Sequence, residues 1–138
     1  MPARPPNLGP PNLVVRPVPA GGLIVFRLVA SDQRDSDAFL NSFKSNAALG
    51  KAPRRRSPEQ SYILIHQGVS VFERRYQAEA MASRFPLGDF VATLRLESGL
   101  GLCTARWGSK GHFSLWGEPL TLLRCVADIV RVDKKGMT

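Results

Sequence analysis

Residues 23–29 of this 138-residue chain read LIVFRLV, an apolar run with one charged side chain, Arg27. Short runs that are rich in β-branched residues and bounded by turn-forming residues are typical of buried strands. Gly21 and Gly22 stand immediately before this run and provide such a boundary. We therefore predict a buried strand over 23–29 and take it as the first element of the folded domain.

Hydrophobic patterns further along the chain predict the remaining elements. A helix is expected over 36–44 with Ser36 as its N-cap, a second over 73–85, and one short helical turn after Pro119. Strands are expected over 62–65, 69–72, 90–96, 100–107, 112–116 and 125–132. This order predicts an α+β fold: a single domain with a strongly twisted or split, largely antiparallel sheet of about six strands and two or three short helices.

The prolines suggest where the folded domain begins. Seven of the 11 prolines lie within the first nineteen residues. Because proline fixes φ and lacks a backbone donor, residues 1–22 are predicted to form a disordered proline-rich tail. The single α+β domain then covers 23–132, and 133–138 form a frayed basic C-terminus.

Lysine and arginine number 19 against 11 acidic residues, a net charge of +8. The tail and one predicted loop carry six of these positive charges, which leaves +2 for the rest: Arg4, Arg16, Lys51, Arg54, Arg55 and Arg56. Arginines clustered on a loop can contact the phosphates of a nucleic acid. No aromatic residue interleaves with Arg54, Arg55 and Arg56, so a solvated loop is favoured and a basic nucleic-acid-binding domain is the weaker alternative.

Several classes of protein are excluded by composition and motif. No apolar run approaches the length of a membrane-spanning helix, and the first residues lack the apolar segment of a secretory signal. Cys103 and Cys125 lie in apolar patterns and suit core thiols in a reducing compartment, so we expect a cytoplasmic protein. His66 and His112 do not share metal-ligand spacing with them, and we expect no metal site.

Arg27 is the most informative polar residue, because a buried guanidinium is costly unless it meets an anion or a carboxylate. Three arrangements accommodate it. The strand can lie at an edge with Arg27 in water, Arg27 can pair with Glu97 or Glu118, or it can bind a phosphate or ribose. Residues 111–119 place His112, Trp116 and Glu118 around another short strand, a pattern typical either of core and turn residues or of a pocket rim.

The order of three motifs resembles small bacterial domains of the ADP-ribosyltransferase-like type. The motifs are VFRL at 25–28, GVSVF at 68–72 followed by an alanine-bearing helix, and FVATL at 90–94. The resemblance covers about residues 23–132. It implies a split, twisted α+β fold that binds NAD in a cleft.

The resemblance also implies roles for individual residues. Arg27 would hold a phosphate or the nicotinamide ribose of NAD, and Ser70 would brace that arginine and the ribose. Phe72 or Tyr76 would stack on nicotinamide, and Glu118 would stabilise the oxocarbenium-like ribose. Glu118 stands in a Gly-Glu-Pro turn and not inside a strand, which makes Glu97 a rival carboxylate.

We add His112 and Trp116 to the predicted NAD-binding set because of their place in 111–119. The expected function is an NAD-using transferase or glycohydrolase, toxin- or effector-like or catalytically degenerate. The alternative is a non-catalytic module that docks an unknown protein partner through the face around Trp107 and Trp116.

Overall fold

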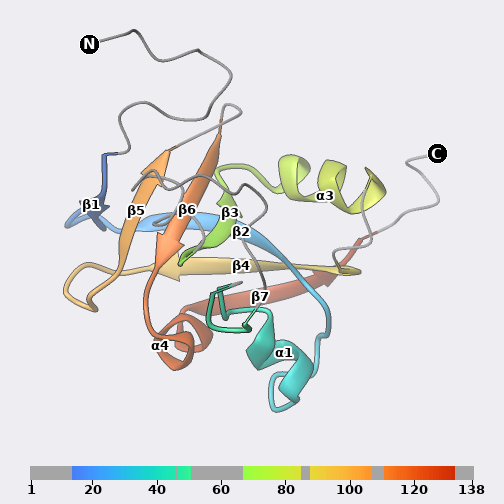
Figure 1. The fold of residues 1–138 in the computed structure, drawn as a ribbon. Helices are drawn as coiled ribbons and strands as arrows, with labels where there is room; N and C mark the ends of the chain where they lie inside the picture. The colour runs from blue at the N-terminus through green and yellow to red at the C-terminus, as the bar shows by residue number, and fades with distance from the viewer. Residues whose placement is uncertain (1–13, 46, 51–66, 85–87, 107–110, 133–138) are drawn as a thin grey trace, which may run out of the picture.

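A computed structural model describes residues 14–45, 47–50, 67–84, 88–106 and 111–132. The described residues form one open sheet of seven antiparallel strands with three helices (Figure 1). The strands are β1 (Arg16–Pro17), β2 (Leu23–Val29), β3 (Val69–Phe72), β4 (Phe90–Leu96), β5 (Cys103–Arg106), β6 (His112–Trp116) and β7 (Val126–Arg131). The helices are α1 (Asp37–Asn41), α3 (Arg75–Arg84) and α4 (Pro119–Arg124). The predicted α+β class is confirmed.

The sheet has seven strands where six were expected, and the additional strand comes from the segment predicted as tail. In β1, Arg16 pairs with Thr104 of β5, and Val18 just beyond it is buried. Proline is tolerated in an edge strand, because one side of such a strand has no neighbouring strand that needs its backbone N–H. Strand β1 lies at an edge of the sheet. The folded body therefore begins before residue 23.

Other predicted segments lie outside the described residues. These are 1–13 of the tail, the strand over 62–65, the arginine-bearing part of the loop, and 133–138.

Strands β2 and β3 share fewer registered residue pairs than any other two neighbouring strands among the described residues. The strand order is β1-β5-β6-β3-β2-β4-β7. Strand β2 pairs with β4 along its whole length, from Leu23↔Leu96 to Val29↔Phe90, but its register with β3 is the single pair Phe26↔Phe72. In Figure 1, β5 and β6 run steeply while β4 and β7 lie across the view. The two groups of strands are thus joined at one registered residue pair and strongly twisted against each other.

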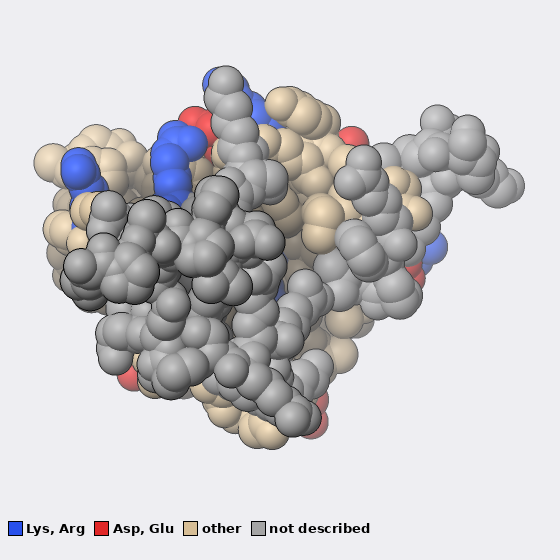
Figure 2. All heavy atoms as spheres, turned by 45° about the horizontal axis from the view of Figure 1, so that its top comes forward, with Lys and Arg blue, Asp and Glu red and all other residues tan. Residues whose placement is uncertain are grey.

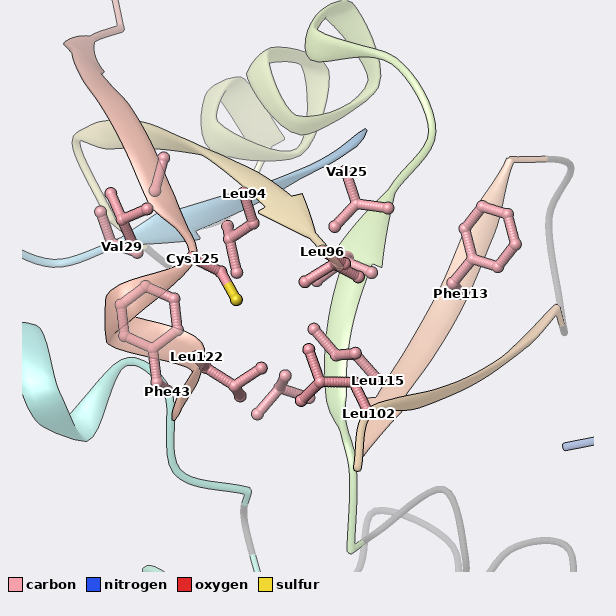
Figure 3. Packing of buried hydrophobic residues seen from close by; sticks show 14 of the residues in the cluster. Val25, Val29, Phe43, Leu94, Leu96, Leu102, Phe113, Leu115, Leu122 and Cys125 are labelled. Carbon is pink, nitrogen blue, oxygen red and sulfur yellow. The ribbon is translucent and has the colours of Figure 1, made fainter. Parts of the chain in front are cut away.

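Alternation along the strands separates two apolar layers. Val25 and Val29 of β2 belong to the larger core cluster, together with residues of α1 and α4. Leu28 belongs to a smaller cluster with Ala78 and Ala82 of α3. Because successive strand residues point to opposite faces, α1 and α4 cover one face and α3 covers the other. Figure 3 shows side chains of the larger cluster converging from strands and helices.

The two short helices on the larger core follow the signals read from the sequence. The Ser36 hydroxyl accepts a hydrogen bond from the Phe39 N–H at 3.1 Å and caps α1. The rings of Phe39 and Phe43 pack edge to face with their centroids 5.2 Å apart, and both are buried. Pro119 opens α4 at a position where its missing N–H costs nothing.

Replacing Leu122 by alanine tests whether α4 is held by its buried face. Leu122 is 1% exposed and lies in the larger core, so Leu122→Ala should lower the free energy of unfolding by about 3 kcal/mol. Leu120, on the same helix, is 64% exposed, and Leu120→Ala should change it by less than about 0.5 kcal/mol. Urea unfolding measures both, and equal losses in the two variants would contradict this packing.

Candidate functional site

Arg27 lies in the middle of the sheet and not at an edge. Its strand, β2, is flanked by β3 and β4. The side chain points to the same face as Val25 and Val29, toward the larger core, and pairs across the sheet with Ala92. The edge-strand explanation for this arginine is therefore wrong.

Two main-chain carbonyls hold the Arg27 guanidinium. Its Nε donates to the carbonyl oxygen of Ser42 at 2.6 Å, and its Nη1 donates to that of Ser70 at 2.5 Å. Among the described residues no carboxylate forms an ion pair with it, so the predicted pairing with Glu97 or Glu118 is also not seen. Burial lowers the pKa of Arg27 to about 10, which still leaves it protonated at neutral pH.

Ser70 meets Arg27 through its backbone. On β3, Val69 and Val71 face the larger core, whereas Ser70 points to the other face and is exposed. The carbonyl accepts the bond from Arg27 beside the junction where β2 and β3 share their one registered pair. The guanidinium thus adds a side-chain link where registered pairing between the two groups of strands is limited.

The two candidate carboxylates lie toward opposite ends of α4. Glu118 is the N-cap residue of α4, is exposed, and makes no side-chain capping bond. Glu97 lies near the C-cap residue Cys125: burial raises the pKa of that thiol, and the negative charge of Glu97 raises it further. Because Leu122 fixes α4 on the larger core, α4 is on the same side of the sheet as the Arg27 side chain.

The predicted aromatic residues belong to the other face. Phe72 and His112 stack with ring centroids 5.2 Å apart and an interplanar angle of 19°, and Phe72 packs on the smaller core beneath α3. Tyr76, in the first turn of α3, is 67% exposed. Trp116 lies over Gly68, where a Cβ atom would come within 3.1 Å of the indole ring.

The predicted set therefore divides into two groups. Arg27 and α4 lie on the face of the larger core, whereas Phe72, His112 and Tyr76 lie on the α3 side.

No group of three or more metal-ligating side chains occurs among the described residues. Arg54, Arg55, Arg56 and Trp107 lie outside those residues. On the face drawn in Figure 2, the described basic and acidic side chains are interspersed. None of the helices in the described ranges has the length and hydropathy needed to span a bilayer.

Ser42 is the site residue that the sequence did not reveal. It is the C-cap of α1, and only the fold brings its carbonyl to Arg27, fifteen positions earlier in the chain. A serine near the end of a predicted helix carries no signal of such a contact.

Comparisons with known proteins give no family assignment. No protein-family model matches this chain, and searches of curated proteins and of solved structures find no match.

The half-buried, stacked His112 should make the stability of the fold depend on pH. Burial lowers the pKa of His112 from 6.5 to about 4, so between these values the unfolded chain binds more protons than the folded chain. Stability from the neutral imidazole is present above pH 6.5 and is lost as the pH falls toward 4. Melting temperatures across this range should fall more steeply for the wild type than for His112→Phe, which keeps a ring against Phe72 but does not titrate. Parallel curves would contradict a buried neutral histidine.

Proposed function

We propose that this chain is an NAD-binding domain of the ADP-ribosyltransferase-like type, acting as a transferase or an NAD glycohydrolase. The observation that carries the proposal is the Arg27 guanidinium. It is half-buried on an interior strand, it is charged, and carbonyls are its partners in the described part of the chain. Carbonyl oxygens satisfy hydrogen bonds without neutralising the charge, so a phosphate of NAD is a suitable counterion.

The reaction requires a negative charge near the nicotinamide ribose. The bond between C1′ of that ribose and the nicotinamide nitrogen breaks, and nicotinamide leaves with the electron pair. Positive charge develops on the sugar, where a carboxylate stabilises it. A nucleophile on the acceptor, or water in the hydrolytic case, then forms a bond to C1′ and gives up its proton.

Glu118 is the carboxylate we assign to this role. It is exposed at the start of α4, and among the described residues it has no ion-pair or capping partner. Helix α4 lies on the sheet face toward which Arg27 points. Glu97, in contrast, lies close enough to Cys125 to raise the pKa of its thiol.

The proposal rests on Arg27 and Glu118 and assigns no nicotinamide contact to the aromatic residues. Phe72 is already stacked on His112, and the position of Tyr76 on α3 separates it from the face of the larger core. Trp116 is packed over Gly68. The contacts of Phe72, His112 and Trp116 thus lie within β3, β6 and the residue before β3, on the α3 side of the sheet.

Substitution of the two carboxylates tests the assignment. Glu118→Gln should reduce the rate of nicotinamide release from NAD by about a hundredfold or more, because the charge that stabilises the sugar cation is removed. The NAD-induced rise in melting temperature should persist in this variant. Glu97→Gln is the matched control and should keep its activity within about threefold. Loss of release in Glu97→Gln alone would reverse the assignment.

Substitution of the cation tests the binding site itself. Arg27→Lys keeps the charge but loses the planar fork of donors, so we expect NAD affinity to fall by about tenfold or more in isothermal titration. Arg124→Lys, on the exposed side of α4, is the control and should bind NAD as the wild type does. Absence of both NAD binding and nicotinamide release in the wild type would reject the proposed function.

A further inference from the structure

Strand β2 holds Ser42 at two points. The Ala30 N–H, just beyond the end of β2, donates to Ser42 Oγ at 3.1 Å. Arg27 Nε donates to the Ser42 carbonyl oxygen at 2.6 Å. Because the two donors belong to one continuous segment, the hydroxyl contact fixes where the carbonyl lies relative to the guanidinium.

Ser42 also ends α1. Its N–H donates to the Ala38 carbonyl, and its hydroxyl donates to the same carbonyl at 3.0 Å. Helix α1 has five residues and is too short to persist without tertiary contacts. Its docking depends on the buried rings of Phe39 and Phe43 and on the bonds through Ser42.

These contacts set the orientation of the guanidinium. Arginine carries five N–H donors in a planar fork. With Nε bonded to Ser42 and Nη1 bonded to Ser70, the outer edge that Nη1 shares with Nη2 keeps a fixed direction. In the described part of the chain no carboxylate pairs with this edge. Two parallel donors on such an edge suit a phosphate oxyanion, which they bind in a two-pronged manner.

We propose that Ser42 is a positioning residue that couples the docking of α1 to oxyanion binding at Arg27. The docked helix presents its last carbonyl to Nε and so orients the guanidinium for a phosphate or pyrophosphate group. By thermodynamic linkage, an oxyanion bound at Arg27 stabilises the docked helix by the same factor. The inference rests on the proposed function in taking the phosphates of NAD as the natural ligand.

Hydrogen exchange of the 36–44 peptide measures this coupling directly. Sodium pyrophosphate should slow exchange in 36–44 of the wild type. In Ser42→Ala, pyrophosphate affinity should fall by about fivefold, the loss expected for one positioning hydrogen bond, and the protection should diminish. Ser42→Thr retains a hydroxyl and should bind within about twofold of the wild type. Ser83→Ala removes a similar hydroxyl-to-carbonyl bond from α3 and is the matched control, with binding and α1 exchange unchanged.

Each outcome decides the inference. Unchanged exchange in 36–44 of the wild type on saturation with pyrophosphate would overturn it, and this measurement needs no variant to fold. Equal affinities in Ser42→Ala and wild type would also overturn it. Pyrophosphate binding with protection of α1 but no binding of NAD would support the coupling and reject the proposed function. Binding of NAD without protection of α1 would support the proposed function and reject the coupling. Failure of NAD and pyrophosphate to bind at millimolar concentration would reject the coupling and the proposed function together.

Discussion

The guanidinium of Arg27 lies beside the one registered residue pair that joins the two groups of strands. It links β2 to β3 through the Ser70 carbonyl and links β2 to the end of α1 through the Ser42 carbonyl. A neutral apolar side chain would pack on the larger core but would leave both carbonyls without these donors. The Arg27 guanidinium therefore helps to hold the sheet and α1 together. Its carbonyl partners do not neutralise its charge, and this charge is the basis of the proposed phosphate binding.

The two apolar cores hold the helices on opposite faces of the sheet and so determine which groups lie on the Arg27 face. The larger core fixes α1 and α4 on one face through Phe39, Phe43 and Leu122, and the smaller core fixes α3 on the other. One short helix thus supplies a carbonyl to Arg27 and the other presents Glu118 on the same side of the sheet. The stacked pair of Phe72 and His112 joins β3 to β6 on the α3 side, away from the face to which Arg27 points.

Much of the fold was predictable because local signals and burial agree. The apolar run of β2, the Ser36 cap and Pro119 at the start of α4 each specify an element by chain-local physics. Strand β1 was missed because its two residues lie in a proline-rich segment, and only pairing with β5 makes them a strand. Arg27 was singled out correctly as an unusual residue, but its partners were not predicted. Every residue carries a main-chain carbonyl, so the sequence gives no sign of which carbonyls the guanidinium meets, and the Ser42 and Ser70 contacts come only from the fold.

We infer that Arg27 is a charged guanidinium of fixed orientation that binds an oxyanion. Nuclear magnetic resonance of the arginine Nε–H groups tests it most directly, with the Arg27 signal assigned by its loss in Arg27→Lys. We expect this signal to exchange slowly with water, because the Nε hydrogen is bonded to the Ser42 carbonyl, and to shift on titration with NAD or pyrophosphate. An Arg27 signal that exchanges as fast as those of exposed arginines, or that stays unchanged at saturating concentrations of both ligands, would contradict it.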